Sequence, residues 1–203
     1  MNKNVKELIH KSLPQAISYT EYRNLVSTLA QEGKSTGPVQ TEALANYTQL
    51  NDRRMKRWDK TFRIDEETIA KIQNIEENVT WLVLTESWCG DASPALPVMQ
   101  KISEINPNIT FKIVLRDENL ELMNQFLTNN AMSIPKLIQL DSETNKVLGT
   151  WGPRSKNATE LVMAYKSKHG VLSAEFKQDL QVWYNKDKGQ SVLNELMELL
   201  PLK

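Results

Sequence analysis

The chain has 203 residues, 40% of them hydrophobic, and its 25 basic residues are balanced by 25 acidic residues. This length and apolar share suit one compact unit with a single core. Because the formal net charge is zero, no overall field attracts the protein to nucleic acid or to an anionic membrane, and neither is expected as a partner.

Targeting signals and cofactor motifs are missing from the sequence. The first residues lack the apolar core of a signal peptide, and no stretch approaches the roughly 18 apolar residues of a membrane span, so we expect a soluble, cytoplasmic protein. A single cysteine, Cys89, excludes an intramolecular disulfide, and His10 and His169 lie too far apart to suggest a metal-ligand pattern. We predict no metal and no other cofactor, and no sequence feature indicates an oligomeric state.

Residues 1–63 are predicted to form a helical N-terminal extension. Apolar residues recur at helical spacing near residues 5–9, near residues 25–29 and along residues 44–58, with a break at residues 33–38. On the third of these helices the residues expected to face solvent are Asn51, Asp52, Arg53 and Lys56. The basic run at residues 53–58 fits either a solvated helix face or a nucleic-acid patch; the acidic neighbours favour the solvated face.

The middle of the chain alternates strands with helices. A further helix over residues 65–75 leads into residues 79–85, a nearly continuous apolar run typical of a strand covered on both faces. A helix follows over residues 94–105, and Pro97 should kink it. The remaining predicted elements are a strand over residues 109–115, a helix from residue 116 to about 129, a hairpin of residues 137–140 and 146–151, a helix over residues 158–168, and one or two helices over residues 173–200.

This order of elements resembles the thioredoxin fold over roughly residues 64–169. Trp88-Cys89-Gly90 matches the family's active-site opening, Pro97 follows Cys89 by eight residues as in thioredoxins, and Ile134-Pro135 is similar to the family's cis-proline loop. The resemblance implies an α/β, three-layer fold with a mixed sheet over residues 64–169, flanked by helical extensions at residues 1–63 and 170–203.

Within the thioredoxins, the motifs look like those of a bacterial subgroup that carries a helical N-terminal extension. The segments that carry it are Glu-Ser-Trp-Cys-Gly-Asp at residues 86–91, Leu-Arg-Asp-Glu-Asn at residues 115–119 and Ser-Ile-Pro-Lys at residues 133–136.

Three departures from the family pattern affect the chemistry. Ala92 stands where the family has its second cysteine, and Asp91 replaces the usual proline, which leaves a Trp-Cys-Gly-Asp-Ala motif with one thiol. Val83 stands where many thioredoxins bury an acid on the central strand. Glu86 is either a substitute proton acceptor or an ordinary hydrogen-bonded loop residue.

Cys89 reacts as its thiolate, and the helix that follows should lower its pKa by about one unit or less. Asp91 would oppose this shift if it is ionised near the sulfur, or it would cap the helix and point away. We expect a moderately reactive thiol.

The resemblance also implies how a substrate binds. A cis peptide bond at Pro135 would leave the backbone of Ser133 and Ile134 free to pair with a substrate segment, beside an apolar rim formed by Trp88, Met132 and Ile134. The alternative is that Pro135 merely begins an edge strand.

Two functions fit these residues. The first is a thiol-disulfide oxidoreductase in which Cys89 attacks protein or small-molecule disulfides and a low-molecular-weight thiol, as co-substrate, resolves the mixed disulfide. The second is a binding or adaptor module that has lost catalysis. A peroxidase is disfavoured because the Pro-x-x-x-Thr/Ser-x-x-Cys pattern of peroxiredoxins is absent.

Overall fold

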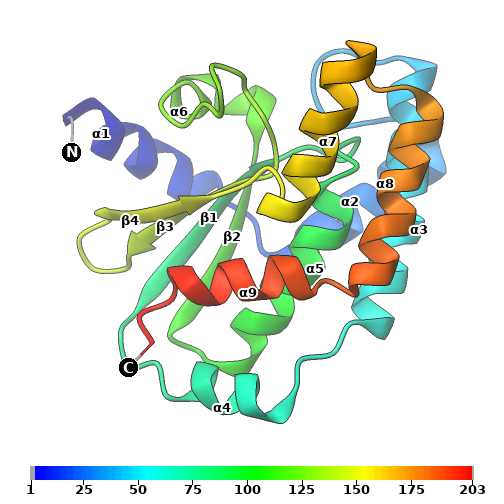
Figure 1. Ribbon diagram of the computed structural model, residues 1–203. Helices are drawn as coiled ribbons and strands as arrows, with labels where there is room; N and C mark the ends of the chain where they lie inside the picture. Colours follow the sequence, from blue (N-terminus) through cyan, green and yellow to red (C-terminus); the bar gives the residue numbers. More distant parts are fainter. Residues whose placement is uncertain (1–2, 203) are drawn as a thin grey trace.

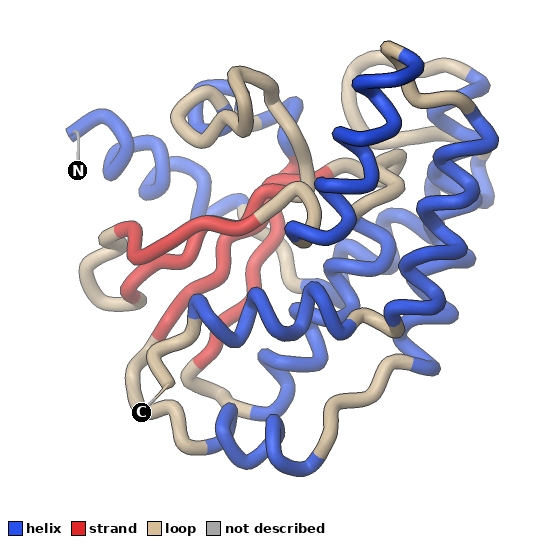
Figure 2. Tube along the Cα trace, in the orientation of Figure 1, coloured by secondary structure: helices blue, strands red, loops and turns tan. Residues whose placement is uncertain are grey.

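The fold is organised on a four-stranded mixed sheet with helices on both faces, in a computed structural model that describes residues 3–202 (Figure 1). Strand β1, Val79–Thr85, is buried along its whole length, as its apolar run predicts. It pairs in parallel with β2, Ile109–Leu115, and antiparallel with β3, Lys136–Asp141. Strand β4, Val147–Trp151, pairs antiparallel with β3, so the order is β2-β1-β3-β4 (Figure 2). The predicted α/β, thioredoxin-like three-layer architecture is confirmed.

The register places the carboxyl ends of β1 and β2 next to each other. Val79 lies opposite Ile109 and Thr85 opposite Leu115, so the two strands end at the same level. The loops that follow them therefore meet at one edge of the sheet. The free side of β2 is covered by the N-terminal segment, because Ile17 and Ile113 exchange two backbone hydrogen bonds of 2.9 Å.

Helix α5, Ala92–Ile105, follows the central strand; its residues 92–99 are all buried, and Pro97 lies among them. Helix α9, Gln190–Leu199, packs against α5 and β4 and extends the same core toward the C-terminal end of the chain (Figure 1). The other helices are α1 (Lys3–Ser12), η1 (Leu13–Gln15), α2 (Tyr19–Glu32), α3 (Glu42–Thr61), α4 (Glu66–Gln73), η2 (Arg116–Glu118), α6 (Leu120–Met123), α7 (Lys156–His169) and α8 (Ala174–Asp187).

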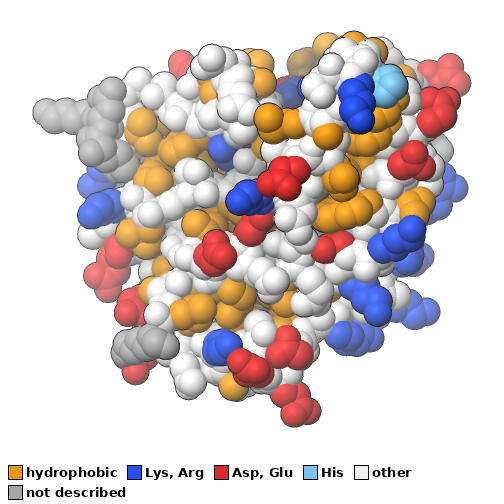
Figure 3. Space-filling view, viewed as in Figure 1, with side chains coloured by type: hydrophobic (Ala, Val, Ile, Leu, Met, Phe, Trp, Pro, Cys, Tyr) orange, Lys and Arg blue, Asp and Glu red, His pale blue; other side chains and the backbone are white. Residues whose placement is uncertain are grey.

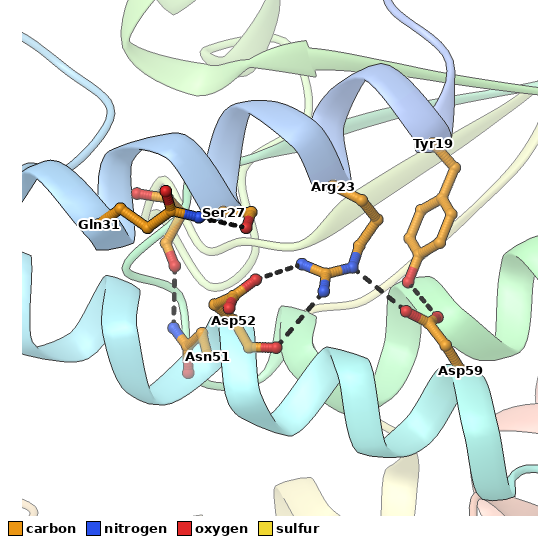
Figure 4. Close-up of polar contacts among 8 residues, drawn as sticks. Tyr19, Arg23, Ser27, Gln31, Asn51, Asp52 and Asp59 are labelled. Atoms are coloured by element: carbon orange, nitrogen blue, oxygen red, sulfur yellow. Dashed lines mark hydrogen bonds and ion pairs between the residues drawn. The ribbon is translucent and has the colours of Figure 1, made fainter.

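A partly buried ionic network joins α2 to α3 (Figure 4). The Arg23 guanidinium lies 3.1 Å from Asp52 Oδ1 and 3.2 Å from Asp59 Oδ2, and the Tyr19 hydroxyl donates to Asp59 Oδ1 at 2.6 Å. A planar guanidinium with several donors suits this bridging role better than an ammonium group. The network fixes the position of α3, and α3 in turn reaches the active-site loop.

Two sequence predictions about the helices are wrong. Asn51 was expected to face solvent, but its side chain is 0% exposed and points at the loop before Cys89. The helix predicted from residue 116 to about 129 is broken into η2 and α6. Asn119 explains the break, because its side chain donates to the carbonyl of Leu115 at 2.9 Å and so competes with helical hydrogen bonding.

The face seen in Figure 3 carries Lys, Arg, Asp and Glu side chains intermixed. Across residues 3–202, no helix is both long enough and apolar enough to cross a membrane.

Candidate active site around Cys89

Cys89 lies in the turn between the end of β1 at Thr85 and the start of α5 at Ala92. Its backbone N–H donates to the carbonyl of Glu86 at 3.1 Å, and the Ser93 hydroxyl donates to the carbonyl of Gly90 at 2.8 Å. These local bonds close the turn and set the cysteine over the amino end of the helix.

The N-terminal extension holds this turn from outside the sheet. Ser87 is bonded to Thr36 in both directions: its N–H donates to Thr36 Oγ1 at 2.8 Å, and its Oγ accepts from the Thr36 N–H at 2.9 Å. Thr48 Oγ1 lies 2.8 Å from Ser87 Oγ, and the Asn51 amide donates to the Ser87 carbonyl at 2.9 Å. Because all four residues are buried, the loop that carries Cys89 has little freedom to shift.

Sequence reasoning missed these supporting residues, although α3 does carry a signal. Ala45, Thr48, Asn51, Met55 and Trp58 are all buried and recur at spacings of three and four residues, which is the period of a helix face. Polar residues inside an apolar stripe indicate that the stripe meets polar groups.

The thiol points at the proline loop. Cys89 Sγ lies 3.2 Å from the Ile134 carbonyl oxygen, and the Ile134–Pro135 peptide bond is cis. Pro135 precedes β3, which lies between β1 and β4, so the alternative that it begins an edge strand is wrong. Gly152 packs against this loop with a positive φ of 107°, and a Cβ there would collide with the carbonyl of Pro135.

Only part of the loop backbone is free to bind a substrate segment. The Ser133 N–H donates to the Ala131 carbonyl at 2.8 Å, and the Ile134 carbonyl accepts from Cys89. The Ser133 carbonyl and the Ile134 N–H have no hydrogen-bond partner within residues 3–202. These two groups are the ones left for strand-like pairing.

Asp91 does not cap α5. Its side chain makes no capping hydrogen bond; instead its carboxylate lies 2.6 Å from the Arg154 guanidinium and accepts from the Tyr184 hydroxyl at 2.9 Å. Burial raises the pKa of Asp91, while Arg154 and Tyr184 act to lower it. Gln181 also donates to the Gly90 carbonyl at 3.2 Å, so α8 is bound to two residues of the motif.

The thiol itself is less acidic than the sequence suggests. Cys89 is only 7% exposed, and burial together with the charge of Asp91 raises its pKa from 9.0 to about 12. The backbone N–H groups of Ala92 and Asp91 and the charge of Arg154 act in the opposite direction but do not compensate. The expected lowering of the thiol pKa by the helix is therefore wrong for this conformation, because desolvation outweighs the helix dipole.

Glu86 is buried beside this turn. Its Oε1 accepts from the Asp117 N–H at 2.8 Å, and burial raises the pKa of the carboxyl group. Within residues 3–202 no hydrogen bond joins this carboxyl group to the sulfur of Cys89. Its role as a proton acceptor stays a prediction.

A hollow of about 560 Å³, here called the Cys89 groove, opens above the thiol. It brings together most of the predicted site residues; Glu86, Ala92 and Pro135 lie outside its lining. Its wall includes Trp88, over whose ring the Arg116 guanidinium lies at 4.8 Å, and Met132, which is 42% exposed. The lining consists of Leu44, Tyr47, Leu50, Arg54, Trp88, Cys89, Gly90, Asp91, Arg116, Met132, Ser133, Ile134, Pro153, Arg154, Leu172, Ala174, Lys177, Gln178, Leu180 and Gln181.

Metal ligands are not gathered in the part of the chain that the structure describes. No three His, Cys, Asp or Glu side chains of residues 3–202 lie close enough together to hold an ion.

Comparisons with known proteins agree with this architecture. A family model described as thioredoxin matches residues 37–168. A protein of unknown function from Pseudomonas aeruginosa has a similar structure, with a TM-score of 0.56 and 19% identity over 76% of this chain and 84% of that one. An HIV epitope scaffold is similar with a TM-score of 0.56 and 17% identity over 90% of this chain and 97% of that one. No curated protein matches the sequence. Since the family model covers most of the chain, including the Cys89 turn and the proline loop, this protein belongs to the thioredoxin family.

Proposed function

We propose that this protein is a thiol-disulfide oxidoreductase that acts through Cys89 and uses an external thiol as resolving agent. The observation that carries the proposal is the position of the sulfur, which lies in the lining of the Cys89 groove, 3.2 Å from the Ile134 carbonyl. The unpaired Ile134 N–H and Ser133 carbonyl beside it suit an extended substrate segment.

The chemistry divides into two exchange steps. The Cys89 thiolate attacks one sulfur of a protein or small-molecule disulfide, the S–S bond breaks, and the released thiolate takes up a proton. The mixed disulfide on Cys89 then needs a second thiolate. The side chain at the position of the usual resolving cysteine is Ala92, and the chain has no other thiol, so the second thiolate comes from a low-molecular-weight thiol.

The raised pKa of Cys89 means that little of the thiol is ionised at neutral pH in this conformation. Burial is the largest cause of that raised pKa, and α8 is bound to the residues beside the thiol, Gly90 and Asp91, through Gln181 and Tyr184. Movement of α8 away from the motif would rehydrate the sulfur and restore an ordinary thiol pKa.

A binding or adaptor module without catalysis is the second candidate. The observation that favours it is the same burial of Cys89, since a thiol with a pKa of about 12 carries very little thiolate at neutral pH. In that case the groove and the two helical extensions would form the functional surface.

Turnover of a glutathionylated protein or a small disulfide separates the two candidates. We expect the wild-type protein to resolve the mixed disulfide on Cys89, and so to turn over, only when glutathione is supplied in excess. The Cys89→Ser protein should be inactive. Equal background rates for the wild type and Cys89→Ser, at any glutathione concentration, would refute the oxidoreductase and leave the binding module.

A further inference from the structure

The Cys89 groove is positively charged although the chain as a whole is neutral. Its lining contains four cationic side chains and one carboxylate, that of Asp91, whereas the formal net charge of the protein is zero. The cationic residues are Arg54, Arg116, Arg154 and Lys177. An excess of one sign in a partly enclosed site raises the local concentration of ligands of the opposite sign.

Two of these cations are already neutralised by the protein. Arg154 lies 2.6 Å from Asp91 Oδ2, and Arg116 lies 2.7 Å from Asp117 Oδ1. Both pairs have partly buried side chains, so their charges are satisfied before any ligand binds.

The other two cations lack a carboxylate partner. Arg54 donates to the Asn51 amide oxygen at 3.1 Å, and Lys177 lies 3.4 Å from the Tyr47 hydroxyl and over its ring at 5.6 Å. Neither forms an ion pair within 4.0 Å in the part of the chain that the structure describes. A guanidinium has five N–H donors and an ammonium has three, so both residues keep donors for a ligand.

These two residues come from two different helices that line the groove. Arg54 belongs to α3 and Lys177 to α8, which lies over α3 in Figure 1. The enclosed volume of about 560 Å³ is in the range of sites for small molecules, and Tyr47 and Trp88 provide flat apolar surfaces in the same wall. The groove therefore fits a small anion better than the surface of a folded protein.

We propose that the external thiol is a small thiol bearing carboxylates, and that Arg54 and Lys177 bind those carboxylates while its sulfur faces Cys89. The inference deepens the proposed function and rests on it for the resolving step. In that step the thiolate of the bound molecule attacks the sulfur attached to Cys89, a new S–S bond forms between the two, and the bond to Cys89 breaks. Cys89 is reduced and takes up the proton that the incoming thiol lost, and the small thiol is oxidised.

Binding can be measured apart from the chemistry. Cys89→Ser protein is titrated calorimetrically with S-methylglutathione, which has two carboxylates and an unreactive sulfur, and with its diethyl ester, in which both carboxylates are masked. We expect Arg54→Gln and Lys177→Gln each to weaken S-methylglutathione binding about tenfold, and added salt to weaken it further. The matched controls are Lys56→Gln on α3 and Lys186→Gln on α8, exposed residues outside the groove that should leave the affinity unchanged.

The same series has clear contrary outcomes. Equal affinity for the ester and the acid, no binding of either ligand, or full affinity in both Arg54→Gln and Lys177→Gln would overturn the inference. Turnover by the wild type with β-mercaptoethanol as efficient as with glutathione would also overturn it while leaving the oxidoreductase intact. Charge-dependent binding without any turnover would support the site and refute the oxidoreductase.

Discussion

The reactivity of Cys89 toward a neutral disulfide should keep rising with pH well beyond the range of an ordinary thiol. The perturbation is pH alone, and the expectation follows from the buried thiol, whose pKa is raised from 9.0 to about 12. A difference of three pKa units lowers the thiolate fraction at pH 8 roughly a thousandfold, equivalent to about 4 kcal/mol. The more basic thiolate is intrinsically more nucleophilic, and over three pKa units this raises the rate constant of the thiolate roughly thirtyfold. The net expectation at pH 8 is a reaction about thirtyfold slower than that of the unfolded chain, before restricted access is counted.

The assay is the second-order rate of reaction with 4,4′-dithiodipyridine between pH 6 and 10. The same protein in urea gives the reference profile of an exposed thiol, which should level off near pH 9, and Cys89→Ser gives the background. If the reaction goes through a transient opening of the groove, the rate still rises about tenfold per pH unit until most molecules ionise. A plateau of the folded protein below pH 10 would refute the reasoning, because it would place the thiol pKa in the ordinary range.

Three further outcomes follow from the contacts of the same site. Asp91→Asn removes a charge that raises the pKa of Cys89, so at pH 8 the variant should react about tenfold faster than the wild type; an equal or slower rate would contradict this assignment. The folded thiol has a raised pKa, so its contribution to stability is complete below pH 9 and is lost as the pH rises toward 12. In urea titrations the wild type should therefore lose about 1.4 kcal/mol of unfolding free energy between pH 8 and 10, relative to Cys89→Ala. A difference between the two proteins that stays constant over this pH range would count against the raised thiol pKa. Thr48→Val removes the buried hydroxyl that contacts Ser87 and should lower the unfolding free energy by about 1–2 kcal/mol. Thr61→Val, at an exposed position on the same helix, should change the unfolding free energy by less than about 0.5 kcal/mol. Similar losses of stability in both variants would argue against a buried anchor at Thr48.

The elements closest to the active site could be predicted from the sequence because local patterns determine them. Strand β1 occupies residues 79–85 as expected, since a continuous apolar run of this length is typical of a strand covered on both faces in an α/β core. The contact between Cys89 and the proline loop is implied by the resemblance to thioredoxins, and the strand pairing accounts for it, because the neighbours of β1 bring residues 89 and 134 to one edge of the sheet. The thioredoxin-family architecture thus depends on features that are readable in short windows.

The chemical state of the thiol could not be predicted in the same way. The sequence around Cys89 predicts a helix N-terminus, which lowers a thiol pKa by about one unit. The burial that outweighs it comes from the tertiary structure: Ile134 approaches the sulfur from 45 residues away, and Gln181 and Tyr184 reach Gly90 and Asp91 from more than 90 residues away. The desolvation of a thiol depends on the residues that cover it, and the local sequence of those residues does not indicate this role.

The two substitutions in the motif, Asp91 and Ala92, and helix α8 form one physical arrangement. A proline at position 91 has no charge to satisfy, whereas a buried aspartate needs partners, and Arg154 and Tyr184 supply them. Meeting that need holds α8 against Gly90 and Asp91, the two residues that follow Cys89. Ala92, which is 2% exposed, stands at the position of the second cysteine and has no sulfur to attack a mixed disulfide on Cys89. In the proposed reaction the resolving thiol enters from outside, and the groove that would admit it is lined by the same helix, α8, that binds Gly90 and Asp91.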